Sequence, residues 1–399
     1  MNESYIVGSV RTAIGKMGGT LKDVTVDYLA ESVIRELMER NGSDIKVDEV
    51  ILGQAKQSAD TSNLARLAAL RADLPVDVSA YTVHRQCGSG LQAINNADMQ
   101  IKLGLSDVVI AGGAESMSTA PYYLRNARFG YRAGNGVLLD PNTESQPCSQ
   151  PIEKYGNLTM GLTAENLAEK YNISREEQDE FAHRSQLLAD EAIKSGRFEK
   201  EIVPFEVKER KKTITFDTDE HPFLTSPEKL ATLPAVFKEN GTVTPGNASG
   251  RNDGASVVLM MNQDKLNEYG LKPKAKIIGQ ATSGVSPEIM GIGPVESTRK
   301  ALKQAGLSIK DIGLIELNEA FAAQALSVIR EAEMDLDKVN VNGGAIALGH
   351  PIGATGAILM TKLLHEMERR GEKYGLVTLC IGGGQGISTV IEYLDRKET

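Results

Sequence analysis

Cysteine is scarce in this chain, and the few cysteines are far apart. They stand at positions 87, 148 and 380 of 399 residues and form no Cys-x-x-Cys pair. This spacing indicates neither a disulfide framework nor a cysteine-based zinc site. The five histidines include no His-x-x-x-His pair. We therefore expect no metal site and a reducing compartment.

Long apolar runs and strongly basic segments are also missing. No apolar run reaches 18 residues, and Met1–Gly8 lacks a basic region followed by an apolar stretch. The sequence therefore predicts a soluble, cytoplasmic protein with no membrane role. The net charge is −9, and no basic block is longer than the one within Glu209–Lys212. These features argue against nucleic-acid binding as a main role.

Glycine, by contrast, is abundant, with 39 residues in a chain of 399. That share exceeds the average of about 7% and favours tight turns over disorder. The chain is also too long for one ordinary core, which predicts two or three domains or a duplicated domain.

Predicted strands and helices alternate in two rounds, which indicates a mostly parallel α/β sheet covered on both faces. Thirty-six positions separate Ile51 from Cys87, and the same number separate Leu314 from His350. Cys87 and His350 each precede a helical pattern, which is followed by a predicted strand that ends in glycines. We read this as an internal duplication about a pseudo-twofold, with sites at the carboxyl ends of strands. The predicted strands are Tyr5–Gly8, Glu49–Gly53, Asp107–Ala111, Ala255–Met260, Ile277–Ala281, Gly313–Leu317, Gly375–Cys380 and Gly386–Glu392.

A polar, loop-rich segment interrupts the alternation. It contains one well-marked helix, which a Ser174–Glu177 capping box begins and Ser195-Gly196 ends. We predict an N-terminal domain from residues 1–119 plus 247–268, a loop domain at 120–246 and a C-terminal domain at 269–399.

Cys87 stands before Gly88-Ser89-Gly90 and a helical pattern. This arrangement predicts a thiol at the first turn of a helix, where the helix dipole lowers a cysteine pKa below about 8.5. A small buried hydrophobe is the alternative interpretation.

Three further stretches point to chemistry. His350 lies between a glycine-rich approach and Pro351-Ile352-Gly353, which suits a base beside a nucleophile. Cys380 ends a predicted strand and opens a glycine run whose N–H groups can face an oxyanion. That run lacks the third glycine of a nucleotide fingerprint, and a strand follows it instead of a helix. Asn318 and Glu319 are polar residues at the end of a predicted buried strand. Burying a polar side chain costs free energy unless it is hydrogen-bonded, so both residues are candidates for a functional role.

Cys-Gly-Ser-Gly, Asn-Glu-Ala-Phe, Gly-His-Pro-Ile-Gly and Cys-Ile-Gly-Gly-Gly, in this order, closely resemble the thiolase family over essentially the whole chain. The resemblance implies that Cys87 is the acyl-accepting nucleophile, His350 its base, and Cys380 the acid/base at the α-carbon of a second acyl-CoA. Asn318, through a water, would share one oxyanion hole with His350. The N–H groups of Cys87 and Gly382 would form the other.

The same resemblance implies a five-layer αβαβα fold and reversible, ping-pong Claisen condensation of two acetyl-CoA molecules. Coenzyme A thioesters would be substrates, and no cofactor would be needed. A homodimer or homotetramer is expected, with Asp107–Ala111 as a candidate interface. The residues expected to contact coenzyme A are Ser249, Phe237, Met160, Ala320 and Phe321.

Some positions leave the acyl length open. Thr159 stands where some short-chain thiolases have histidine, and His221–Phe223 lacks an expected arginine. Arg85-Gln86 resembles the degradative branch, so a longer-chain 3-ketoacyl-CoA thiolase is the alternative. Weaker rivals are a ketoacyl synthase, a non-catalytic acyl-CoA-binding or lipid-binding relative, and a thiol-redox enzyme. We expect Cys148 to be a spacer.

Overall fold

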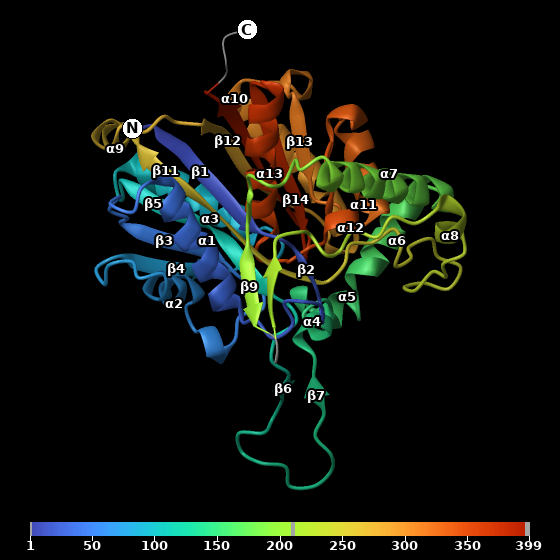
Figure 1. Cartoon of the computed structure of the whole chain (residues 1–399). Helices are drawn as coiled ribbons and strands as arrows, with labels where there is room; N and C mark the ends of the chain where they lie inside the picture. Colours follow the sequence, from blue (N-terminus) through green and yellow to red (C-terminus); the bar gives the residue numbers. More distant parts are fainter. Residues whose placement is uncertain (1, 209–211, 396–399) are drawn as a thin grey trace.

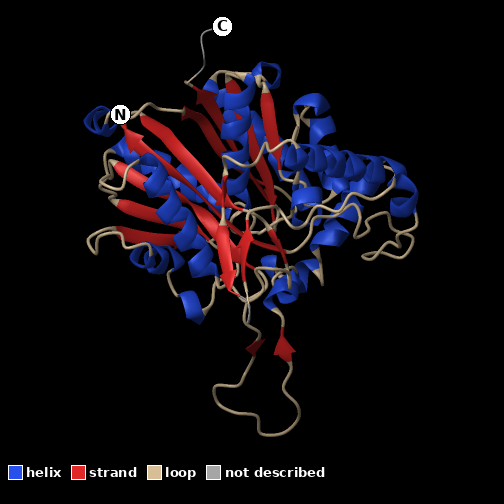
Figure 2. Ribbon diagram, viewed as in Figure 1, coloured by secondary structure: helices blue, strands red, loops and turns tan. Residues whose placement is uncertain are grey.

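One large sheet runs through the molecule, and both halves of the chain contribute to it (Figures 1 and 2). The computed structural model describes residues 2–208 and 212–395. Along the sheet the main order is β4-β3-β5-β11-β1-β12-β15-β14-β13. The bounds of these strands are β1 Ser4–Thr12, β3 Glu49–Gly53, β4 Ser79–Val83, β5 Val108–Ser116, β11 Asn252–Asn262, β12 Ala275–Gly284, β13 Leu314–Leu317, β14 Tyr374–Ile381 and β15 Gln385–Tyr393.

The two halves of the sheet repeat one pairing pattern. β3 is parallel to β4 and β5, β5 is antiparallel to β11, and β11 is antiparallel to β1. In the second half β13 is parallel to β14, β14 is antiparallel to β15, and β15 is antiparallel to β12. A parallel bridge from Ile315 to Val339 takes the place of β4. Antiparallel pairing of β1 with β12 joins the halves, so the topology contains the duplication that the spacing predicts. The prediction of a mostly parallel sheet is wrong, because five of the eight strand pairs along the main order are antiparallel and three are parallel.

Helices form three layers around the folded sheet. The layer between the two sheet halves holds α3 (Ser89–Leu103) and α13 (Thr355–Arg370), whose apolar residues share one core with β5 and β14. The outer layers are α1 (Val26–Asn41) with α2 (Leu64–Arg71), and α10 (Gly293–Ala305) with α11 (Ala322–Glu331). The result is the five-layer αβαβα arrangement that the resemblance implies.

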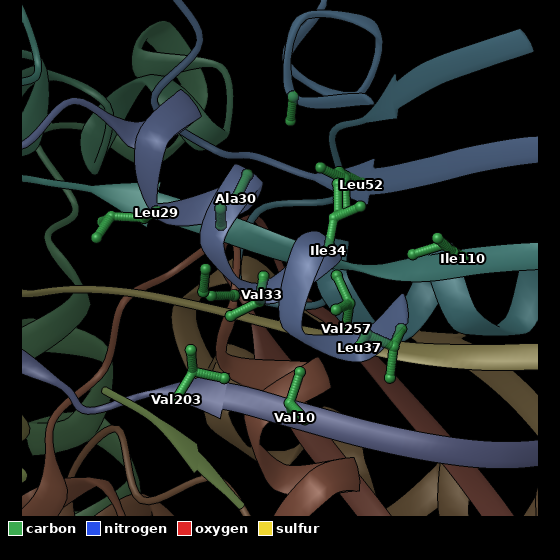
Figure 3. Packing of buried hydrophobic residues seen from close by; sticks show 14 of the residues in the cluster. Val10, Leu29, Ala30, Val33, Ile34, Leu37, Leu52, Ile110, Val203 and Val257 are labelled. Atoms are coloured by element: carbon green, nitrogen blue, oxygen red, sulfur yellow. The ribbon is translucent and has the colours of Figure 1, made fainter. Parts of the chain in front are cut away.

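The outer helix α1 shows how one face builds this core. Leu29, Val33 and Leu37 recur at helical spacing and are fully buried. They pack with Leu52 of β3 and Ile110 of β5 (Figure 3). Burial of a side chain of this size contributes about 1.5–3 kcal/mol.

β5 is buried on both faces, because Ile110 belongs to the core under α1 and Val109 to the core around α3. Both of its edges are paired as well, one with β3 and one with β11. The prediction that Asp107–Ala111 forms a subunit interface is therefore wrong. Its continuous apolar sequence reflects a strand enclosed on all sides.

The segment between β5 and β11 forms a loop-rich cap. The predicted capping box of Ser174 and Glu177 is present at the start of α7 (Arg175–Lys194). A short strand of this segment, β8 (Ile202–Val203), pairs with β1. Its other elements are β6 Tyr123–Leu124, β7 Leu138–Leu139, α4 Pro141–Glu144, α5 Ile152–Tyr155, α6 Met160–Lys170, β9 Phe205–Lys208, β10 Thr213–Phe216 and α8 Pro227–Ala231.

Short elements elsewhere in the described residues include β2 Gly15–Lys16, α9 Gln263–Tyr269 and α12 Ala345–Leu348. Within residues 2–208 and 212–395 no helix has the length and apolar character that crossing a membrane requires.

Candidate active site

Strand ends from both halves meet at one cavity of about 190 Å³. Cys87 follows β4, His350 lies between α12 and α13, and Cys380 and Gly382 lie at the end of β14. All four line the cavity. Asn318 lies one residue beyond β13 and is fully buried. The structure thus brings together residues that are up to 293 positions apart in the sequence.

Cys87 sits in a tight turn before α3, whose N-cap is Gly88. Gln86 has a φ of 47°, in the left-handed region that non-glycine residues rarely adopt. Burial raises the pKa of the Cys87 thiol and is the largest effect on it. The backbone N–H of Gly382, which faces the thiol, and the nearby Lys56 lower this pKa and only partly offset burial. The expectation of a lowered pKa is therefore wrong, because Cys87 precedes the helix and loses solvent.

His350 is fixed by two contacts. Its backbone N–H donates to Asn252 Oδ1 at 2.9 Å, and its Nδ1 lies 2.6 Å from Thr355 Oγ1. The Thr355 hydroxyl donates to the Pro351 carbonyl at 2.9 Å, so it accepts from Nδ1–H and leaves Nε2 as the basic nitrogen. Burial, aided by Lys56, lowers the His350 pKa to about 4. The imidazole is thus neutral near pH 7 and able to accept a proton.

Cys380 is the more deeply buried thiol, and burial together with the Cys87 charge raises its pKa. The turn that follows contains Gly383 and Gly384, with φ values of 86° and 84°. A Cβ on Gly384 would lie 2.3 Å from the Val285 carbonyl oxygen, so the turn requires glycine. Gly382 is thereby held with its N–H toward Cys87.

Asn318 is held by its backbone and free at its side chain. Its N–H donates to the Thr378 carbonyl at 3.0 Å, which ties it to β14 two residues before Cys380. Neither atom of its side-chain amide has a hydrogen-bond partner among residues 2–208 and 212–395. A buried amide in this state is available to bind a water or a ligand.

The residues expected to contact coenzyme A form another wall of the cavity. Ser249 donates its backbone N–H to the Ala320 carbonyl at 3.0 Å. The neighbouring residues Ala248 and Phe321 form an antiparallel β-bridge. Phe237 meets Phe321 edge to face with ring centroids 6.0 Å apart. Met160 lines the same cavity, so all five predicted contact residues surround it.

Four residues at or beside the site escaped sequence reasoning. Lys56 lines the cavity, and Asn252 and Thr355 fix His350. Glu115 is fully buried and accepts backbone N–H groups from both halves of the chain, including that of Gly353 at 2.8 Å. Lys56 and Glu115 carry only a weak sequence signal, because they lie a few residues beyond the predicted strands Glu49–Gly53 and Asp107–Ala111 but stand in no motif.

The Cys148 loop borders the site although its cysteine does not line it. Cys148 is exposed, whereas its neighbour Ser149 lines the cavity and accepts a hydrogen bond from Gln86 at 3.3 Å. Among the residues that the structure describes, no cluster of three or more His, Cys, Asp or Glu side chains could hold a metal ion.

Comparisons with known proteins show which family the chain belongs to. The family models described as the N-terminal and C-terminal domains of thiolase match residues 4–264 and 271–393. An acetyl-CoA acetyltransferase of Syntrophomonas wolfei is 48% identical over 397 residues, covering 98% of this chain and 99% of that protein.

Two solved structures are similar throughout. The Bacillus anthracis acetyl-CoA acetyltransferase is 49% identical with a TM-score of 0.95, and the match covers 99% of each chain. Human mitochondrial 3-ketoacyl-CoA thiolase is 44% identical with a TM-score of 0.93, covering 98% of this chain and 99% of that one. With both family domains matched and relatives this similar over nearly the full length, the chain belongs to the thiolase family.

Proposed function

We propose that the chain is an acetyl-CoA acetyltransferase that condenses two acetyl-CoA molecules to acetoacetyl-CoA and CoA, reversibly. The observation that carries the proposal is the cavity itself, which the two thiols of Cys87 and Cys380 and the neutral imidazole of His350 line together. The unpartnered buried amide of Asn318 is tied by its backbone to β14, the strand that carries Cys380. These groups suffice for acyl transfer and for proton abstraction at carbon.

In the first half-reaction, the Cys87 sulfur attacks the carbonyl carbon of acetyl-CoA as His350 Nε2 accepts the thiol proton. The N–H groups of Cys87 and Gly382 stabilise the oxyanion. Collapse breaks the bond from carbon to the CoA sulfur, and His350 returns the proton to that sulfur. The products are acetyl-Cys87 and CoA.

In the second half-reaction, Cys380 as thiolate removes an α-proton from a second acetyl-CoA. His350 and a water on Asn318 stabilise the resulting enolate. The α-carbon attacks the acetyl-Cys87 carbonyl, a carbon–carbon bond forms, and the Cys87 thiolate leaves. The Cys87 sulfur then takes up the proton that Cys380 accepted, so that both cysteines return to their starting states. The raised pKa of Cys380 suits this step, because a weak carbon acid needs a strong base.

Coenzyme A thioesters are substrates in this proposal, and the chemistry needs no separate cofactor. Ser249 would hydrogen-bond the pantetheine arm, and Phe237, Ala320 and Phe321 would contact its apolar part. Met160 would meet the acyl end. The position of all five around the cavity supports the assignment.

Acyl length is tested by CoA-dependent cleavage of acetoacetyl-CoA, 3-ketohexanoyl-CoA and 3-ketodecanoyl-CoA, followed by loss of enolate absorbance. We expect the highest kcat/KM with acetoacetyl-CoA. The longer-chain alternative has less support, because the bacterial relatives above are named acetyl-CoA acetyltransferases. Higher rates with the longer substrates would move the protein to the degradative branch, and no cleavage of any of them would overturn the thiolase mechanism.

The assembly, location and domain limits are further parts of the proposal. We infer a homodimer or homotetramer, because the hairpin of β6 and β7 projects from the body (Figure 1). Apolar side chains of this hairpin are exposed, among them that of Phe129, which is 94% exposed. Light scattering on a chain shortened at this hairpin tests the assembly.

A cytoplasmic location suits thiols that must stay reduced. The three domains keep the limits 1–119 plus 247–268, 120–246 and 269–399.

A further inference from the structure

Three neighbouring strands end beside the nucleophile. β3 pairs with β4 on one side and β5 on the other, with Gly53 opposite both Val83 and Gly113. Lys56 comes three residues after β3, Cys87 four residues after β4, and Glu115 lies near the end of β5. Because these three strands run parallel, their carboxyl ends meet at one edge of the sheet. An ammonium, a thiol and a carboxylate therefore gather there.

Lys56 is buried to an unusual degree for a lysine, with only 8% of its surface exposed. Its Nζ donates to Ser145 Oγ and, at 3.4 Å, to the Pro141 carbonyl, both from the loop segment around α4. Its backbone N–H donates to Glu115 Oε1 at 3.0 Å. The side chain is thus fixed along the cavity wall that Cys87 and His350 also line.

We propose that Lys56 is a positioning residue whose buried ammonium group stabilises the thiolate form of Cys87. The role deepens the proposed function, on which it rests. Burial disfavours a thiolate, and a fixed cation at the same cavity offsets that cost. The same cation disfavours a charged imidazole at His350 and so keeps that base neutral.

The other charged and titratable groups around Cys87 do not supply this charge. His350 is neutral near pH 7, Cys380 would add a negative charge when ionised, and Glu115 is itself a buried carboxylate. Arg251 lines the cavity but lies 3.8 Å from Asp140, and 42% of its side chain is exposed. Burial lowers the pKa of Lys56 itself, and the charges of Glu115 and Cys87 oppose that lowering. Lys56 lines one cavity with Cys87 and His350 and lowers the pKa of both.

A structural role is the competing explanation, because Lys56 also ties the α4 loop to β3. The two roles differ in one observable, the pH dependence of thiol reactivity. Loss of a tether changes stability and loop order, whereas loss of the charge moves the pH at which the thiolate forms.

The test measures the rate of Cys87 alkylation by iodoacetamide against pH, with the modified residue identified by mass spectrometry. Lys56→Gln keeps a donor for Ser145 but removes the charge, and Lys56→Arg keeps the charge. We expect Lys56→Gln to raise the midpoint by about one pH unit, making alkylation roughly tenfold slower below both midpoints. Lys56→Arg should restore most of the difference.

Ser145→Ala is the matched control, because it removes the tether and leaves the ammonium; its midpoint should stay close to that of the wild-type protein. Lys56→Met is a second charge-free variant should Lys56→Gln fail to fold. A folded Lys56→Gln or Lys56→Met protein with the wild-type midpoint would overturn the proposal. Alkylation needs no acyl substrate, so this outcome is independent of whether the protein acts on acetoacetyl-CoA.

Discussion

His350 couples the catalytic base to the stability of the fold. Its pKa is about 4 in the folded chain and near 6.5 when the imidazole is solvated. Between these values the unfolded chain binds a proton that the folded chain does not, so the free energy of unfolding falls as the pH falls from 6.5 toward 4. This contribution amounts to about 3 kcal/mol at most.

Chemical denaturation at several pH values, compared with His350→Gln, measures that contribution. The wild-type protein should lose more unfolding free energy than the variant across this range. His221, whose pKa burial also lowers to about 4, titrates in both proteins and cancels in the difference. Parallel pH profiles for the two proteins would show that His350 is not buried in its neutral form.

The two thiols predict different defects in the two half-reactions. Cys87→Ala should form no acyl-enzyme with acetyl-CoA, because the nucleophile is gone. Cys380→Ala should still acylate Cys87 but should lose condensation by about 10²-fold or more, because it lacks the α-carbon base. Mass spectrometry of the acylated protein and an acetoacetyl-CoA assay separate the two steps. Normal condensation by Cys380→Ala would make its assigned role wrong.

At the scale of elements, Arg11 joins β1 to the loop segment. Its fully buried guanidinium lies 2.7 Å from both Glu201 and Asp219. Arg11→Met would leave two buried carboxylates without their cation, which costs about 3–5 kcal/mol of unfolding free energy. Urea denaturation measures the loss.

Arg35→Met is the matched control for that change, because Arg35 pairs with Glu31 and Asp73 at a surface where 41% of its side chain is exposed. It should cost less than about 1 kcal/mol. Equal losses in the two variants would mean that the Arg11 cluster does not hold β1 and the loop segment together.

Periodic elements were predictable, and their neighbours in space were not. The apolar spacing of Leu29, Val33 and Leu37 is typical of a helix such as α1, and the capping box predicted α7. The apolar run of β5, however, was misread as an interface, because one strand's sequence does not reveal that both its edges are paired.

The site divides in the same way. Motifs with glycines and a reactive side chain located Cys87, His350 and Cys380, because few other patterns demand those residue types together. Lys56 and Glu115 stand in no such motif. Their role depends on the pairing of β3 with its two neighbours, which is a tertiary fact.

At the scale of the whole molecule, the active site depends on how closely the two halves approach. α3 begins beside Cys87, α13 begins beside His350, and both lie in the layer between the two sheet halves. Glycine permits the contact, because a Cβ on Gly356 would lie 2.5 Å from the Leu91 backbone nitrogen. The same contact therefore sets the packing of the halves and the distance between nucleophile and base.

Gly356→Ala should consequently harm both properties together. Overpacking at this contact should cost about 1–3 kcal/mol of unfolding free energy. Displacing α3 from α13 should lower kcat for acetoacetyl-CoA cleavage by about tenfold or more, because misplaced reacting groups lose rate steeply. Gly284→Ala is the control, since no atom lies within 4 Å of its added Cβ and its backbone is not in the left-handed region. A folded Gly356→Ala protein with unchanged kcat would show that the spacing of Cys87 and His350 is set elsewhere than at the contact of α3 with α13.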